Sequence, residues 1–316
     1  MFLERLAQIY PGRTGEAVLA TFQTARPTTF RVNTLLAEPA VIRRSLHDAG
    51  FQLERVPWSP VAFVLKNRSG RELTETPEYR SGHLYVQGLS SMLPPLILDP
   101  QPGETVLDIT AAPGSKTTQM AALMRNQGKI IANDNNKPRF FKLMANVKLQ
   151  QATCVECTMH HGETLWRRWS EAFDRVLVDA PCSAEGRFHT SDPKTYHFWK
   201  PQKVHEMMRK QKRLLYAAIH LLKPGGTLVY ATCTFAPEEN EAMVSCVLEK
   251  FHDTVVCVPS GVPVANTLHG LLSWEGRRFL PDTRNAVRIM PTATMEGFFL
   301  AKMVKRPTLD SAVLPE

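Results

Sequence analysis

Two short stretches of the sequence each place a cysteine directly after an apolar run. Val176–Cys182 ends in a carboxylate, a proline and a thiol, and Tyr230–Cys233 ends in a second thiol. A thiolate is a strong nucleophile, although only a few per cent of an ordinary thiol is ionised at neutral pH. A helix expected from Pro237 would stabilise the thiolate of Cys233 through its N-terminal dipole. The pattern indicates nucleophilic chemistry at two strand ends; the alternative interpretation is two buried, inert cysteines.

A third stretch, Asp108–Thr117 (DITAAPGSKT), predicts a ligand-binding turn between a strand and a helix. Its small residues let backbone amides approach a ligand, and the helix N-terminus offers positive potential. It is no phosphate-binding loop, because Ser115 separates Gly114 from Lys116. Asp134 ends the next strand, where an acidic side chain suits a ribose diol, although a carboxylate there can also be a turn former. Together these residues favour a nucleoside-type ligand.

Alternating strand and helix patterns explain how these residues could meet. Strands are expected at Thr105–Ile109, Lys129–Asn133, Cys154–Met159, Arg175–Asp179 and Thr227–Thr232. Helices are expected at Lys116–Met124, Lys137–Gln150, Pro201–Leu222 and Pro237–Phe251, the third ended by a glycine turn at Leu222–Gly226. A final pair of strands is expected near Thr254–Pro259 and Gly297–Lys302. Such alternation predicts an α/β fold with a parallel sheet, whose strand ends gather ligands at one edge.

The N-terminal part predicts a separate, smaller unit. Residues 1–26 suit two short helices, and residues 28–65 follow a βαββ-like pattern that resembles half of an RNA-recognition fold. Polar residues at Leu84–Ser91 precede a helix-like run to Leu98, and prolines near residue 100 mark a boundary. We therefore expect domains at residues 1–95 and 96–304, followed by a frayed tail at 305–316.

The charge of the chain favours a polyanionic partner. Lysine and arginine exceed aspartate and glutamate, giving a net charge of +8. Residues 187–213 concentrate basic side chains among aromatic ones, a pattern that suits RNA phosphates and bases but also a solvated helix face. The expected RNA contacts are Arg187, Lys200, Lys203 and Arg209. The sequence has no apolar run of about 18 residues, and its N-terminus lacks the charged-then-apolar pattern of a signal peptide. We therefore expect no membrane partner and a cytoplasmic location.

The six cysteines do not predict a disulfide framework in such a chain. Cys154 and Cys157, followed by His160 and His161, have the spacing of half a zinc site. No second ligand pair has suitable spacing, so buried strand cysteines are the default interpretation and no metal is expected.

Taken together, the motifs resemble the Sun/nucleolar-protein family of RNA cytosine-5 methyltransferases, which use S-adenosylmethionine. The resemblance covers about residues 25–304. It is carried by Arg31–Asn33, Gln87-x-x-Ser90-Ser91, Ala111–Thr117, Asp179–Ser183, Tyr230–Cys233, Pro237–Glu241 and Gly297–Phe299. It implies a class I, Rossmann-like methyltransferase domain with a seven-stranded, mostly parallel sheet, preceded by a small α+β RNA-recognition-like domain.

The resemblance also implies roles for individual residues. Cys233 would attack cytosine C6, Asp179 would hydrogen-bond the polar edge of the base near the cofactor, and Cys182 would assist release. Lys116 would lie near the cofactor carboxylate or the RNA. The cofactor would be held by Asp134, Asp179 and the turn residues Ala111, Ala112, Pro113, Gly114, Ser115, Lys116 and Thr117.

This chain departs from the family pattern at one cofactor position. Many members have an aspartate after the third strand, whereas this chain has His161 beside Gly162, so the adenine contact is not assigned. The main interpretation is a monomeric enzyme that methylates cytosine C5 in rRNA or tRNA. The alternatives are a methyltransferase of the same fold with another substrate, such as DNA cytosine, and a non-catalytic RNA-binding or assembly factor.

Overall fold

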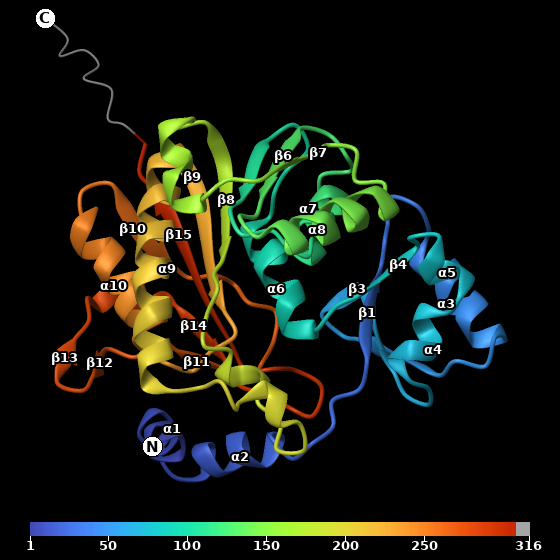
Figure 1. The fold of residues 1–316 in the computed structure, drawn as a ribbon, viewed down its shortest axis with the longest axis horizontal. Helices are drawn as coiled ribbons and strands as arrows, with labels where there is room; N and C mark the ends of the chain where they lie inside the picture. Colours follow the sequence, from blue (N-terminus) through green and yellow to red (C-terminus); the bar gives the residue numbers. More distant parts are fainter. Residues whose placement is uncertain (308–316) are drawn as a thin grey trace, which may run out of the picture.

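The computed structural model describes residues 1–307, so most of the expected tail, residues 308–316, lies outside the described residues. Figure 1 shows a large sheet with its helices on the left and a smaller N-terminal unit on the right. Two short helices, α1 (Phe2–Ile9) and α2 (Arg13–Thr21), lie beneath the larger unit. Their apolar sides pack on Phe188 and Phe235, so the start of the chain supports a loop of the larger unit rather than its own domain.

The smaller unit has the order βαββααβ, with two short helices before its last strand. It comprises β1 (Thr29–Val32), α3 (Pro39–Asp48), β2 (Leu53–Val56), β3 (Ser59–Leu65), the short helices α4 (Gly70–Thr74) and α5 (Pro77–Arg80), and β4 (Leu84–Val86). Its antiparallel sheet has the strand order β2-β3-β1-β4. The strand β4 was not expected from the sequence, because three residues are too few to show an alternating pattern. With β4, the unit has the complete split βαβ arrangement rather than half of it.

Both faces of this small sheet are covered. One face packs on α3 through a core that includes Phe30, Phe63 and Leu46. On the other face Val56, Ala62 and Val64 join a core with helix α6 (Leu89–Leu98) of the larger unit. All four residues of β1 are buried. The sheet face that an RNA-recognition fold presents to bases is therefore used for packing between the two units.

The larger unit is built on a mixed sheet. The strands β5 (Thr105–Asp108), β6 (Lys129–Asn133), β7 (Val155–Thr158), β8 (Phe173–Asp179) and β9 (Leu222–Thr232) run parallel in the order β7-β6-β5-β8-β9. The antiparallel strand β15 (Phe298–Lys305) follows β9 and pairs with β10 (Val255–Val258), as the sequence predicted. This arrangement confirms the expected α/β class with a largely parallel sheet.

Within residues 1–307 this sheet has nine strands, not the expected seven. The difference comes from β14 (Val287–Ile289) and β11 (Thr267–His269), which add to the far side of β15. Both are too short to show a strand period in the sequence. A separate small hairpin, β12 (Ser273–Trp274) with β13 (Arg277–Arg278), projects beyond this edge.

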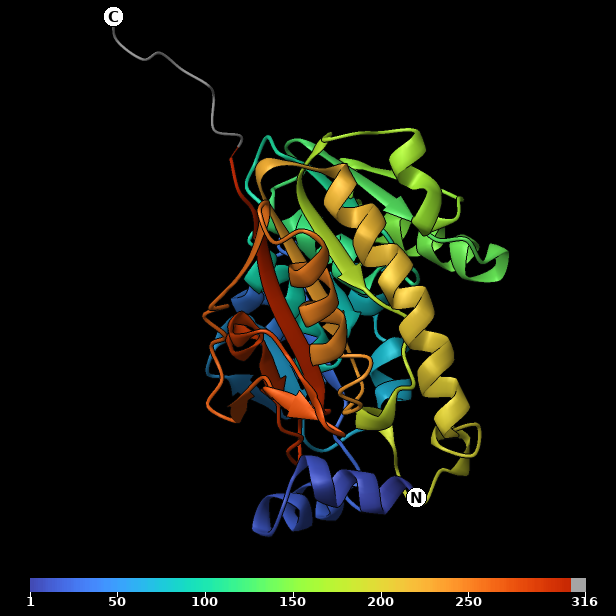
Figure 2. The same ribbon diagram turned by 90° about the vertical axis from the view of Figure 1, so that its left-hand side faces the viewer.

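Helices cover both faces of the large sheet. Figure 2 shows the long helix α9 (Pro201–Leu221) and α10 (Glu241–Lys250) side by side on one face, where they enclose the largest apolar core. On the other face α6 and α7 (Ser115–Leu123) pack over β5 and β9. The helix α8 (Lys137–Leu149) lies between α7 and the N-terminal unit.

Two expected helix boundaries are wrong. The helix after Cys233 begins at Glu241 rather than Pro237, because Asn240 is buried and bonds Thr232 and Thr234, which makes a turn of the preceding residues. Cys233 therefore does not lie beside a helix N-terminus. The helix α9 ends without a glycine cap, since Leu222 is already extended and pairs with Phe173 as the first residue of β9.

Candidate active site

The ends of the parallel strands surround a cavity of about 890 Å³. This volume lies within the range of roughly 300–1,000 Å³ that is typical of ligand sites. The sequence-predicted residues that line it are Ala112, Pro113, Ser115, Lys116, Asp134, Asp179, Cys182, Cys233 and Arg187. Ala111, Gly114 and Thr117 belong to the same turn but do not reach the cavity wall. Strand ends that are far apart in sequence thus meet at one edge, as parallel strands require.

The two motif cysteines lie in contact within this cavity. Their Sγ atoms are 3.3 Å apart, and both side chains are half-buried. The hydrogen bond to Cys233, followed by burial, raises the pKa of Cys182 well above its ordinary value. The two sulfur atoms therefore share one hydrogen bond inside the cavity, and the raised pKa favours the protonated form of Cys182.

Buried polar side chains hold the two cysteine loops together. The Ser183 hydroxyl bonds the Thr234 hydroxyl at 2.7 Å, and the Gly186 amide donates to the Cys233 carbonyl at 2.9 Å. The backbone amide of Phe235 donates to Glu185 at 3.1 Å. These bonds between the loops fix the distance between the sulfur atoms.

The Cys182 loop is also anchored from behind by Glu239. This carboxylate accepts hydrogen bonds from the Ser183 amide at 3.0 Å and from Gln211 at 2.8 Å. Burial raises the pKa of Glu239 to about 8. The sequence reasoning gave Glu239 no role, although it stands in the quoted motif Pro237–Glu241.

A cation and a carboxylate line the same cavity as the two cysteines. Lys116 Nζ lies 2.7 Å from Asp179 Oδ2 and 2.7 Å from the Ser91 hydroxyl. The Lys116 side chain is only 8% exposed, whereas Asp179 is 32% exposed. Asp179 can therefore accept a hydrogen bond from a ligand while it stays paired with Lys116. Ser91 was quoted in a motif without a role, and its position beside Lys116 is visible only in the tertiary structure.

The turn between β5 and α7 forms one wall of the cavity. Its peptide bond from Ala112 to Pro113 is cis, and Gly114 has a positive φ of 103°. No side chain caps the first turn of α7, so its amide groups remain available to an anionic group. Behind the turn, Asp108 accepts a hydrogen bond from Thr117 at 2.7 Å. Burial raises the pKa of Asp108 to about 7.

Asp134 lies at the end of β6 and is only 3% exposed. Its oxygens accept hydrogen bonds from the amides of Asn136 at 3.0 Å and Ala112 at 3.3 Å, and Arg139 lies 3.2 Å away. The carboxylate therefore fixes the shape of the turn while it borders the cavity. His161 also lines the cavity, with its side chain 70% exposed.

Of the expected RNA contacts, only Arg187 lines the cavity, and it lies 3.6 Å from Glu296. Lys200 and Arg209 are exposed outside it, and Lys203 pairs with Glu206 at 3.3 Å. Two other basic residues of the same stretch, Lys210 and Arg213, do line the cavity. Sequence reasoning missed them because the face of α9 that points to the cavity depends on how the helix packs.

The aromatic residues of this stretch have two different surroundings. Tyr196 and Phe198 are 37% and 40% exposed, and are therefore free to contact a ligand. Phe188 and Trp199 pack instead on Phe2 of helix α1. Only half of the interleaved aromatics are thus in position to stack on bases.

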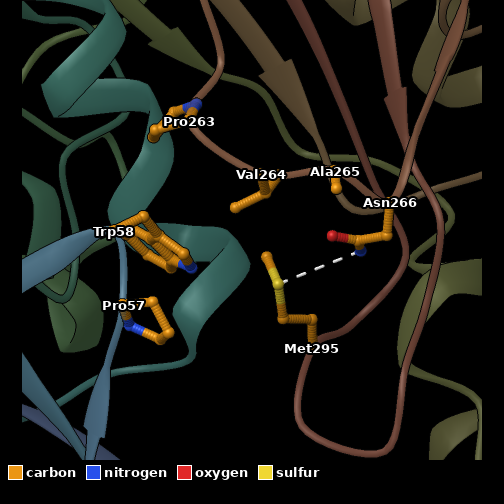
Figure 3. A pocket seen from close by; sticks show the side chains of 7 residues that line it. All are labelled: Pro57, Trp58, Pro263, Val264, Ala265, Asn266 and Met295. Carbon is orange, nitrogen blue, oxygen red and sulfur yellow. Dashed lines mark hydrogen bonds between the residues drawn. The ribbon is translucent and has the colours of Figure 1, made fainter.

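A second pocket, of about 510 Å³, lies between the N-terminal unit and the loops that precede β11 and β15 (Figure 3). It is lined by Pro57, Trp58, Pro263, Val264, Ala265, Asn266 and Met295. None of these side chains is titratable, and none lines the larger cavity, so the chemistry belongs to the larger one.

Two further features bear on the expected partners. Among residues 1–307, no group of three or more His, Cys, Asp or Glu side chains is placed to hold a metal ion. Over the same range, no helix combines the length and the apolar character that crossing a bilayer requires.

The parallel sheet, the turn before α7 and the acidic residue after β6 define a Rossmann-like methyltransferase. The family model for 16S rRNA methyltransferase RsmB/F matches residues 95–304, and that for the N-terminal domain of 16S rRNA methyltransferase RsmF matches residues 1–88. The chain belongs to the RsmB/F family. The expected family is thereby confirmed, and so is the cofactor, because members of this family use S-adenosylmethionine.

Individual relatives agree with this membership. A tRNA (cytosine(49)-C(5))-methyltransferase from Pyrococcus abyssi is 39% identical, with 90% of this chain and 89% of the relative covered. Ribosomal RNA small subunit methyltransferase F from an Escherichia coli strain is 37% identical and covers 99% of this chain, which spans only 64% of that relative. A solved methyltransferase homologue from Pyrococcus horikoshii is 34% identical, with a TM-score of 0.82 over 96% of this chain and 93% of the homologue.

Proposed function

We propose that this chain transfers a methyl group from S-adenosylmethionine to C5 of cytosine in RNA, through a covalent bond between Cys233 and C6 of the base. The observation that carries the proposal is the contact between Cys182 and Cys233 in a cavity that Lys116 and Asp179 also line. C5 of neutral cytosine is too poor a nucleophile to accept a methyl group unaided. A sulfur bonded to C6 removes this difficulty by making C5 electron-rich.

The chain's own residues account for each step. Cys233 Sγ forms a bond to C6, and Asp179 accepts a hydrogen bond from the polar edge of the base, which orients it. The bound cofactor supplies an electrophilic methyl group for C5. Once Cys233 is bonded to carbon, the thiol hydrogen bond between the two cysteines, which is the largest cause of the raised pKa of Cys182, is changed. Cys182 can then release its proton to water, and its thiolate takes the proton from C5. The electrons of the C5–H bond restore the C5–C6 double bond, and Cys233 leaves C6 as a thiolate.

The residues of the cavity fit the cofactor. Its amino-acid end carries a carboxylate, which suits the uncapped N-terminus of α7 and the nearby Lys116. Its ribose carries hydroxyl groups that can donate to Asp134 at the end of β6. The turn residues 111–117 would enclose the cofactor between these two ends.

The role of Asp134 gives the first testable prediction. Asp134→Ala should weaken S-adenosylmethionine binding by roughly ten- to a hundredfold, because a hydrogen bond to a charged group contributes about 1.5–3 kcal/mol. Isothermal titration calorimetry measures this affinity directly. Asp134→Asn is the matched variant, since its amide oxygen can still accept a bond from the Asn136 amide and keep the turn. Unchanged affinity in both variants would remove Asp134 from the site.

RNA would approach the cavity over its basic rim. Arg187, Lys210 and Arg213 border the opening, and Lys200, Lys203 and Arg209 extend the positive surface along the same stretch. We expect the active form to be a monomer. A cytoplasmic location fits an RNA substrate of the rRNA or tRNA class.

Transfer of labelled methyl groups tests the proposed function. The purified chain should label cytosine C5 in unmodified rRNA or tRNA, and bisulfite sequencing of the product should locate the position. Ribosomal RNA is the first substrate to try, because the matching family models are of 16S rRNA methyltransferases. Transfer to DNA cytosine instead, or cofactor binding without transfer to any RNA, would contradict the proposal.

A further inference from the structure

The solvent side of helix α8 combines positive charge with exposed apolar side chains. The helix contains four basic residues and no acidic one. Lys137, Phe141, Met144 and Lys148 are spaced by four, three and four residues, which places them on one side of an α-helix. Phe141 is 56% exposed and Met144 is 45% exposed, whereas Leu143 is fully buried on the opposite side. Because Phe141 and Met144 are exposed to solvent, packing of the helix does not explain why large apolar side chains stand between cations there.

This side of α8 leads away from the cavity. At the start of the helix Arg139 lines the cavity, with its guanidinium 3.2 Å from Asp134. Just after its end, the Gln150 carbonyl accepts a hydrogen bond from Asn33 of the N-terminal unit at 2.9 Å. Figure 1 shows α8 between the large sheet and that unit. The exposed stripe therefore begins at Lys137, directly after the cavity residue Asn136, and runs along the helix to Lys148.

The N-terminal unit cannot offer the usual RNA-binding face of its fold. That face of its sheet packs on α6 through Val56, Ala62 and Val64. Substrate that extends from the cavity must therefore follow another surface. On one side it meets the basic stretch of α9, and on the other side it meets α8.

We infer that single-stranded RNA next to the target cytosine lies along α8, an inference that rests on the proposed RNA substrate. Lys137 and Lys148 on the stripe, together with Lys142 on the neighbouring exposed side of the helix, contact its phosphates, since cations without neighbouring acids on the helix complement a polyanion. Phe141 provides a stacking surface for a base. Any base can stack on an aromatic ring, so α8 contributes to the affinity for RNA and to the direction of the bound strand. It does not select the target cytosine.

Two kinds of variant separate these contributions. Replacing Lys137, Lys142 and Lys148 with glutamine should reduce the slope of log affinity against log salt by about two, because single strands lose roughly 0.7 per phosphate contact. Phe141→Ala should weaken binding roughly tenfold at every salt concentration, with the slope unchanged. Fluorescence anisotropy with a short labelled single-stranded RNA measures both effects.

A matched control carries the same change of charge elsewhere. Arg125, Lys129 and Lys250 are exposed and lie where the strands of the sheet begin, opposite the cavity. Their replacement with glutamine should leave the slope nearly unchanged. Equal slopes for the α8 and control variants, together with unchanged binding by Phe141→Ala, would overturn the inference.

RNA binding by the α8 variants and methyl transfer by the wild type are separate measurements, so the two proposals can fail separately. If the wild type methylates RNA but the α8 variants bind RNA normally, only the present inference fails. If the wild type methylates no RNA, the proposed function fails, while the salt slopes still decide whether α8 binds RNA. Thermal melting of each variant with cofactor verifies that it is folded.

Discussion

Replacing Cys233 with alanine should abolish methyl transfer, whereas replacing Cys182 should trap the enzyme on its RNA. Without Cys233 no sulfur attacks C6, so the rate should fall on the order of 10⁴-fold or more. Without Cys182 the attack and the methylation still proceed. Release then slows, because the residue that takes the proton from C5 is missing. The expected product is a protein–RNA complex that survives denaturing electrophoresis.

Incubation of each variant with RNA and cofactor distinguishes the two roles. The Cys182→Ala complex should accumulate, and the double variant should form none, because the trapped bond needs Cys233. Cys154→Ala is the matched control: this half-buried cysteine lies in a different strand region and does not line the cavity. A trapped complex in Cys233→Ala instead would reverse the two roles. Cys182 would then be the nucleophile.

Replacing Glu241 with alanine should produce the largest loss of stability. Glu241 and Arg288 are 0% and 1% exposed, and Arg288 Nε lies 2.6 Å from Glu241 Oε1. Arg288 also donates to the Phe235 carbonyl at 2.9 Å and to the Tyr10 hydroxyl at 3.1 Å. Removing the carboxylate leaves a buried guanidinium without a counter-charge, which costs about 3–5 kcal/mol. Urea unfolding monitored by circular dichroism measures the loss.

An exposed ion pair provides the control for this measurement. Glu275 is 60% exposed and lies 3.3 Å from Arg5, so Glu275→Ala should change stability by less than about 1 kcal/mol. Replacing Glu241 and Arg288 together with leucine and methionine should recover most of the stability, because neither charge then remains buried. A small effect of Glu241→Ala alone would mean that water reaches Arg288 in the native state.

The buried ion pair of Glu241 and Arg288 also connects distant parts of the chain to the loop that carries Cys233. Arg288 stands on β14, Tyr10 follows α1, and Phe235 is two residues beyond Cys233. The first helix is thus tied to the loop that carries the proposed nucleophile. For this reason Glu241→Ala should reduce activity even at temperatures where the variant stays folded.

Strand ends with reactive residues were the strongest signal in the sequence. The strand at Lys129–Asn133 has the expected bounds, and those at β5, β7 and β8 differ by at most two residues at either end. The strands β5, β6 and β8 are largely buried, so their apolar runs are nearly continuous and end sharply at polar residues. The chemistry-bearing residues stand directly after such runs, which is why the cavity could be expected before its geometry was known.

The sequence alone determined the class of fold, the family and the gathering of Lys116, Asp179, Cys182 and Cys233, because these depend on local patterns and the order of strands. The tertiary structure decided that the sulfur atoms of Cys182 and Cys233 lie in contact, although the two residues are 51 positions apart in the sequence. It also decided that Ser91 accepts a bond from Lys116, that the N-terminal sheet is covered, and that α8 presents its cations to solvent. Each of these features depends on which faces of the helices and strands pack together. Packing between segments that are distant in the sequence determines this, whereas the apolar periodicity of a single segment does not.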